Sequence, residues 1–93
     1  MQYIKVQWIH NDLDYPVLLY SELDADRWEV RKVEIFHDDR MEYADQDREI
    51  GTTGLGEEPV PTLEEIANDP EFLPEEITQD EFEQIWAKAL GSN

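Results

Sequence analysis

Residues 3–9 have the sequence Tyr3-Ile4-Lys5-Val6-Gln7-Trp8-Ile9, in which every second residue from Ile4 is large and apolar. Side chains of an extended chain point alternately to opposite faces, so Ile4, Val6 and Trp8 share one face. This period of two predicts a strand. A strand with one apolar face needs neighbours in a sheet, so the sequence that follows decides the fold class.

Three further segments predict strands, at residues 17–23, 27–36 and 41–44. Clusters of Asn, Asp and Pro separate them and are typical of turns. In the third segment the apolar phase shifts, because Trp28 and Val30 are even-numbered whereas Val33 and Ile35 are odd-numbered. A β-bulge near Arg31-Lys32 would place all four side chains on one face. Residues 1–44 are therefore predicted to form an antiparallel β-meander.

The rest of the chain predicts helices after a glycine- and proline-rich loop at residues 45–61. Thr62 to Glu65 matches a capping box and begins a short helix that ends before Pro70. Phe72 and Leu73 are expected to anchor the following linker. A second capping pattern, from Thr78 to Glu81, begins a helix over Gln79–Leu90, with Gly91 as its C-terminal cap.

These elements predict a single α+β domain over residues 1–93, made of a meander (1–44), a loop (45–61) and a helical part (62–93). Its antiparallel sheet has three to four strands. Both C-terminal helices are expected on one face of it, which gives a two-layer architecture.

Charge is the strongest compositional signal, with 24 Asp and Glu against 7 Lys and Arg, for a net charge of −17. Residues 41–93 carry fifteen of the acids and only two bases, Arg48 and Lys88. Such a field repels nucleic acid and anionic lipid and attracts cationic partners. With 40% apolar residues the chain can still bury a core, so disorder throughout is not expected.

The sequence contains no cysteine, which excludes disulfides, thiolate metal ligands and a cysteine nucleophile. Its first residues lack the basic and apolar pattern of a secretion signal, and no apolar run approaches membrane-spanning length. We therefore expect a cytoplasmic protein that does not contact a membrane.

No motif predicts catalysis, a cofactor or a metal. His10 and His37 have acids beside them but lack the local spacing of metal ligands. The carboxylate pairs Glu57-Glu58, Glu64-Glu65 and Glu75-Glu76 lie in polar segments where nothing would raise a pKa for acid catalysis. The glycines of residues 51–56 lack the Lys-Ser/Thr pair of a phosphate-binding loop.

Arg27, Arg31 and Lys32 are the one local concentration of bases, interleaved with Trp28. Arginine and tryptophan together can bind phosphate and base, as an RNA site would require. The alternative is structural: these bases pair with acids of the sheet such as Glu22 or Glu29, and Trp28 lies in the core. The net charge favours the structural alternative.

Five segments that span nearly the whole chain carry a resemblance to known sequences: Tyr3–His10, Leu19–Asp24, Arg27–Phe36, Leu55–Pro59 and Glu81–Trp86. In these segments the chain resembles a family of small acidic bacterial proteins of unknown function. This resemblance implies a bacterial single-domain protein and transfers no catalytic residue. The family tends to have glycine where Asp39 stands, which leaves the turn type there open. In size and charge the chain is also similar to immunity proteins that neutralise bacterial toxins.

Our leading hypothesis is a non-enzymatic module that binds a basic protein, as an immunity protein or antitoxin binds a nuclease toxin. Its predicted binding residues are Glu57, Glu58, Glu64, Glu65, Glu75, Glu76, Asp80 and Glu83. Tyr20 or Tyr43 would add an aromatic anchor if it faces outward.

Two alternatives stay open. One is an enzyme or small-ligand binder that uses the sheet face around His10, Arg27, Trp28 and Glu29. The other is an oligomer joined through the strand edge at residues 41–44, whereas the leading hypothesis expects a monomer or weak homodimer.

Overall fold

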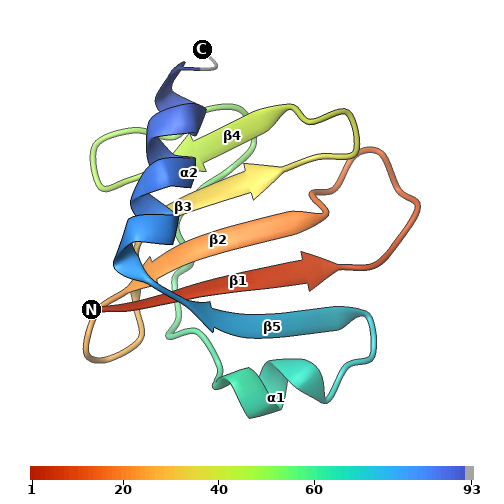
Figure 1. Cartoon of the computed structure of the whole chain (residues 1–93), viewed down its shortest axis with the longest axis vertical. Helices are drawn as coiled ribbons and strands as arrows, with labels where there is room; N and C mark the ends of the chain where they lie inside the picture. Colours follow the sequence, from red (N-terminus) through yellow and green to blue (C-terminus); the bar gives the residue numbers. More distant parts are fainter. Residues whose placement is uncertain (92–93) are drawn as a thin grey trace.

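The computed structural model describes residues 1–91 and shows an α+β fold, as predicted, with one five-stranded antiparallel sheet and two helices (Figure 1). Residues 92–93, the end of the predicted helical part, lie outside the described residues. The elements are β1 (Gln2–Trp8), β2 (Leu18–Leu23), β3 (Glu29–Ile35), β4 (Met41–Ala44), α1 (Leu63–Ala67), β5 (Phe72–Ile77) and α2 (Gln79–Gly91). The sheet order is β4-β3-β2-β1-β5, so the meander is confirmed, whereas the predicted limit of four strands is wrong.

The fifth strand, β5, lies within the part predicted to be helical. It pairs with β1 from Trp8↔Phe72 to Tyr3↔Ile77. Its sequence lacks clean alternation and has Pro74 in its middle, a residue that sheets accept on edge strands, where an N–H is not needed. Phe72 packs against the core as expected, but Leu73 is 51% exposed and does not anchor the segment.

The two helices pack on opposite faces of the sheet, so the expected arrangement with both helices on one face is wrong. On the face that α2 crosses, Tyr3 of β1 packs with Phe82 and Trp86. On the other face, Ile4 packs in a second cluster with Leu63 and Ile66 of α1. Successive residues of β1 are therefore buried on both faces, which a prediction based on one apolar face misses.

The helix starts follow the sequence signals closely. At α1 the Thr62 hydroxyl accepts a hydrogen bond from the Glu65 amide at 3.2 Å, and the Glu65 carboxylate accepts one from the Thr62 amide, so the capping box is confirmed. At α2 the Thr78 hydroxyl accepts from the Glu81 amide at 3.1 Å. Gly91 is the last residue of α2 and not a cap beyond it.

The irregular strand β3 contains the expected bulge, one residue earlier than predicted. Arg31 pairs with Glu22 whereas Glu29 pairs with Leu23, which leaves Val30 as the extra residue. Trp28 precedes the strand and is 41% exposed. The prediction that Trp28 shares the buried face and lies in the core is therefore wrong.

Residues 36–50 form two tight connections around β4. The Phe36 amide donates a hydrogen bond to the Arg40 carbonyl at 3.0 Å and closes a three-residue loop, residues 37–39. Asp39, the last residue of this loop, has φ +66°, so the turn is a three-residue hairpin loop with a left-handed final residue. The chain then folds back along β4, where Glu49 bridges to Ala44 and the Ile50 amide donates to the Tyr43 carbonyl. The end of the β4 edge at Tyr43 and Ala44 is therefore paired within the chain, and this shortens the edge predicted to join two copies.

Among residues 1–91, neither helix is long and apolar enough to cross a membrane.

Candidate functional site

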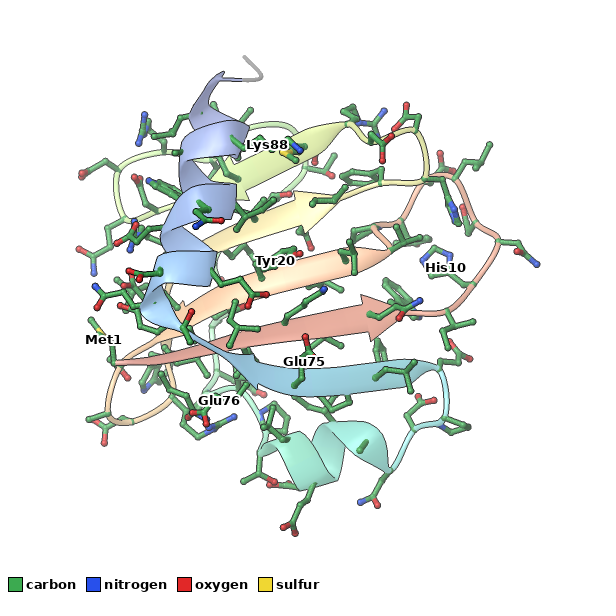
Figure 2. All side chains as sticks on the ribbon, viewed as in Figure 1. Met1, His10, Tyr20, Glu75, Glu76 and Lys88 are labelled. Atoms are coloured by element: carbon green, nitrogen blue, oxygen red, sulfur yellow. The ribbon has the colours of Figure 1, made fainter. Side chains whose placement is uncertain are left out.

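The acids predicted to bind a partner lie along the crossing segment (residues 45–61), α1, β5 and the start of α2. Figure 2 shows Glu75 and Glu76 on β5, the edge strand beside α1. Within the described residues five of the eight have exposed side chains with no hydrogen-bond or ion-pair partner: Glu57, Glu58, Glu64, Glu76 and Asp80. Glu65 is engaged in the capping box of α1, and Glu75 lies 4.0 Å from Lys5.

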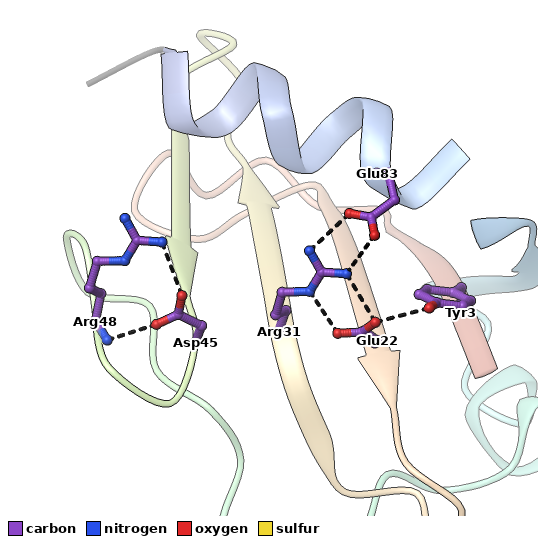
Figure 3. Close-up of polar contacts among 6 residues, drawn as sticks. All are labelled: Tyr3, Glu22, Arg31, Asp45, Arg48 and Glu83. Atoms are coloured by element: carbon purple, nitrogen blue, oxygen red, sulfur yellow. Dashed lines mark hydrogen bonds and ion pairs between the residues drawn. The ribbon is translucent and has the colours of Figure 1, made fainter. Parts of the chain in front are cut away.

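The eighth acid, Glu83, belongs to a partly buried ion-pair network that connects α2 to the sheet (Figure 3). Arg31 of β3 donates to Glu22 of β2 at 2.6 Å and 3.0 Å and to Glu83 of α2 at 2.9 Å and 3.0 Å. The Tyr3 hydroxyl completes the network by donating to Glu22 at 2.9 Å. Glu83 thus has a structural partner within the chain, unlike the five acids above.

The network shifts the pKa values of Glu22, Tyr3 and Arg31. The guanidinium of Arg31 holds the pKa of Glu22 below its ordinary value, against the opposing effect of burial. Burial and the hydrogen bond to Glu22 raise the pKa of Tyr3. Hydrogen bonds to Glu22 and then to Glu83 raise the pKa of Arg31. All three shifts favour the observed charge states, so the network is a stable structural unit at neutral pH.

The basic concentration of β3 is used for internal contacts, as its structural alternative predicted. Arg31 pairs with Glu22, and Lys32 lies 3.2 Å from Glu29. Lys32 also donates to the Gly54 carbonyl at 3.0 Å, and Arg27 donates to the carbonyls of Val60 at 2.8 Å and Pro61 at 2.6 Å. Arg27 and Lys32 thus hold the crossing segment against the sheet, whereas Arg31 holds α2 through Glu83.

Carboxylates of β3 and β4 hold the other half of the crossing segment. Glu42 accepts from the Thr52 amide at 3.0 Å, Glu34 accepts from the Thr53 hydroxyl, and Glu29 accepts from the Gly56 amide at 2.7 Å. The face opposite α2 is therefore polar over β4 and β3, where it binds a loop, and apolar over β2, β1 and β5.

An open apolar cleft of about 330 Å³ lies over that apolar half. Its floor and walls come from β1, β2, β5, α1 and the crossing segment, and its apolar lining includes Ile4, Val6, Leu19, Ile66, Phe72 and Val60. Ser21 and Glu29 close one end, where the Ser21 hydroxyl donates to Glu29 at 3.0 Å. Glu65 and Asp69 lie on the side of α1.

Sequence reasoning identified only Glu29 and Glu65 of this cleft. Ile66 and Phe72 went unnoticed as lining residues because they were assigned to a helix and a linker on the wrong face. The signal that could have revealed the cleft is the pair Tyr3-Ile4, since two adjacent large apolar residues in a strand indicate burial on both faces.

The alternative ligand face is divided by the structure between two ends of the sheet. Gln2 pairs with Leu23 and Leu23 with Glu29, so Arg27, Trp28 and Glu29 lie near the beginning of β1. His10 follows the other end of β1, as Figure 2 shows. Of the four residues, only Glu29 lines the apolar cleft.

At its own end, His10 takes part in an aromatic cluster with Trp8, Tyr15 and His37. The ring centroids of His10 and His37 are 5.4 Å apart. Both nitrogens of His10 are engaged, because Nε2 lies 2.7 Å from the Pro16 carbonyl and Nδ1 accepts from the Asp12 amide at 3.0 Å. No group of three or more His, Asp or Glu within residues 1–91 is placed to hold a metal ion.

Neither tyrosine expected as an anchor faces outward. Tyr20 is 8% exposed and Tyr43 is 5% exposed, and both belong to the core beneath α2. Tyr43 packs edge-on against Trp86 with ring centroids 5.4 Å apart. The condition for an aromatic anchor is therefore met by neither tyrosine, because these strand positions point to the face that α2 covers.

Comparison with known proteins identifies the family of the chain. No curated protein and no solved structure matches the chain. The model of one family, described as a domain of unknown function (DUF6881), matches residues 2–91. That match covers nearly all of the chain, as the resemblance to an uncharacterised small-protein family implied, and the chain belongs to the DUF6881 family.

Proposed function

We propose that this protein is a non-enzymatic acidic module that binds a basic protein, in the manner of an immunity protein or antitoxin bound to a nuclease toxin. The observation that carries the proposal is that several acids are exposed without a side-chain partner, whereas most of the bases are held in contacts within the chain. Glu57, Glu58, Glu64, Glu76 and Asp80 are exposed without a side-chain partner among the described residues.

The bases are in the opposite situation. Arg27, Arg31 and Lys32 are held in contacts with the crossing segment and the sheet, and Arg48 is held by Asp45 at 3.0 Å. They are therefore poorly placed to neutralise the exposed acids. A basic partner would neutralise them, and its approach would be accelerated by the long-range field.

The proposal predicts salt-dependent binding through specific acids. The test compares the wild-type chain, a site variant (Glu57→Gln, Glu58→Gln, Glu75→Gln and Glu76→Gln) and a control variant. The control removes the same number of charges elsewhere (Asp14→Asn, Asp26→Asn, Asp39→Asn and Asp47→Asn). Each is immobilised and exposed to extract of the source cell at low and high salt, and bound proteins are identified.

We expect one basic protein to be captured by the wild type and the control, released by salt, and lost in the site variant. The purified partner should then lose its own activity, for example nucleic-acid cleavage, when the wild type is added. Capture of no basic protein would contradict the proposal. So would equal binding by the site variant and the control, since the proposed acids would then have no special role.

A further inference from the structure

The apolar cleft between α1, β5 and the crossing segment has the size and lining of a small-ligand site. Its volume of about 330 Å³ lies at the lower end of the range for ligand pockets, about 300–1,000 Å³. Ile4 and Val6 of β1 are buried at its floor, and Leu19, Ile66 and Phe72 are half-buried around it. A ligand that fills this space must have an apolar body of a few carbon atoms.

Charge decides which kind of apolar ligand fits. The ionisable residues that line the cleft are Glu29, Glu65 and Asp69, and no Lys, Arg or His of residues 1–91 lines it. Glu29 is already satisfied by Ser21, the Gly56 amide and Lys32. The charge available to a ligand therefore comes from the two acids at α1.

Each of these two acids has one oxygen committed and one available. Glu65 Oε1 accepts from Thr62, and Asp69 Oδ1 accepts from the Glu71 amide at 2.9 Å. Within the described residues, Glu65 Oε2 and Asp69 Oδ2 have no hydrogen-bond partner. The committed oxygens hold the two acids in place beside the cleft, and the other oxygens can accept hydrogen bonds from a ligand.

We propose that this cleft binds a small organic cation of the alkylammonium class, with its hydrocarbon chain over Ile4, Val6 and Leu19. Its ammonium group donates hydrogen bonds to Glu65 and Asp69. An alkyl carboxylate would place like charges together, and a neutral alcohol would gain the apolar contacts without the ion pairs. This inference concerns a small molecule, and it is independent of the protein partner proposed above.

The test uses n-hexylammonium as the probe and follows the methyl NMR signals of Ile4, Val6, Leu19 and Ile66 at physiological ionic strength. Ethylammonium carries the same charge without the chain, whereas n-hexanoate and n-hexanol carry the chain without the positive charge. We expect saturable shifts of these methyl signals with hexylammonium. Its affinity should exceed that of ethylammonium by at least about ten-fold, because four additional methylene groups are buried.

Matched variants distinguish binding in the cleft from attraction by the overall negative charge of the protein. The double variant Glu65→Gln with Asp69→Asn keeps the internal hydrogen bonds but removes two charges at the cleft. It should lower the affinity for hexylammonium roughly three- to ten-fold. The double variant Asp47→Asn with Glu81→Gln removes two charges that lie away from the cleft, and it should lower the affinity for hexylammonium less than about two-fold. Val60→Phe should block binding by filling the cleft.

Three results would overturn the proposal. One is the absence of saturable shifts at the cleft methyls. Another is hexanol binding as tightly as hexylammonium, and the third is equal weakening by both charge variants. If Val60→Phe does not fold, the comparison of the two charge variants still tests the proposal. Gln at position 65 and Asn at position 69 keep the capping contacts, and an amide spectrum like that of the wild type verifies that each variant is folded.

Discussion

Replacing Arg31 by methionine should be one of the most damaging single changes at a polar residue of this protein. Arg31 links β3, β2 and α2 through Glu22 and Glu83, and its guanidinium lies 5.0 Å from the Phe82 ring and 5.1 Å from the Trp86 ring. Methionine keeps most of the packing volume and removes the charge. The Glu22 carboxylate, whose side chain is 8% exposed, then keeps only the Tyr3 hydroxyl as its side-chain partner.

The expected magnitude follows from burial. Removing one partner of a fully buried ion pair costs about 3–5 kcal/mol because the other charge is left uncompensated. The Arg31 side chain is 19% exposed and that of Glu83 is 44% exposed, so water reaches part of this network and the lower limit applies. We expect a loss of about 3 kcal/mol in the free energy of unfolding, or roughly 12–24 °C in Tm for a domain of this size.

Urea unfolding at pH 7 measures the loss, with Arg48→Met as the matched control. Arg48 also pairs with a carboxylate, Asp45, but its side chain is 48% exposed and water screens the pair, so the control should lose much less stability than Arg31→Met. A loss below 1 kcal/mol for Arg31→Met, or equal losses for both variants, would refute the reasoning.

The stability difference between the wild type and Arg31→Met should also depend on pH. The pKa of Glu22 is lowered in the folded wild type, so its stabilising contribution is present above its ordinary value of 4.5 and is lost as pH falls through the lowered value. In Arg31→Met the buried carboxylate is instead unfavourable and is relieved by protonation. The stability difference between wild type and variant should therefore shrink from pH 6 towards pH 3, and a constant difference would contradict the proposed role of Glu22.

Three further predictions concern single residues. Asp39 has φ +66°, so Asp39→Gly should remove left-handed strain and raise stability by up to about 1 kcal/mol in urea unfolding; an unchanged or lower midpoint would count against this. Gly51 has φ +74° and a Cβ there would overlap the Glu42 carboxylate, so Gly51→Ala should lower stability by about 1–2 kcal/mol, and a neutral result would show that residues 51–53 do not hold this conformation in solution. Burial and Glu22 raise the pKa of Tyr3, so its contribution is complete below pH 10 and is lost as pH rises through the raised value. Wild type should therefore lose stability relative to Tyr3→Phe above pH 10, and parallel pH profiles would argue against a buried phenol.

Local signals determined most of the fold that could be predicted from the sequence. The strand alternation of residues 3–9 and the capping residues Thr62 and Thr78 depend on neighbours within a few positions, and all three were located correctly. β5 was missed because its place is set by a partner that is distant in sequence. Its edge position permits Pro74 and exposed acids that would be unfavourable in a central strand.

The face on which each helix packs is likewise a long-range property. α1 has only five residues and no buried residue of its own, so its sequence does not indicate that it covers Ile4 and Val6 on the face opposite α2. The apolar cleft was missed for the same reason: its lining residues come from five elements (β1, β2, β3, α1 and β5) and the crossing segment, and they share no local pattern. Glu29 and Glu65 were noted for their charge and not for their position.

The charge asymmetry of the sequence acquires a physical meaning from these contacts. Arg27, Arg31 and Lys32 belong to the half with nearly balanced charge, and each is committed to holding either the crossing segment or α2 against the sheet. They cannot leave those contacts to neutralise Glu57, Glu58 or Asp80 without releasing the crossing segment or α2, which carry these acids. The fold therefore maintains an acidic surface that only salt or a cationic partner can neutralise, and both proposed sites use this property at different scales.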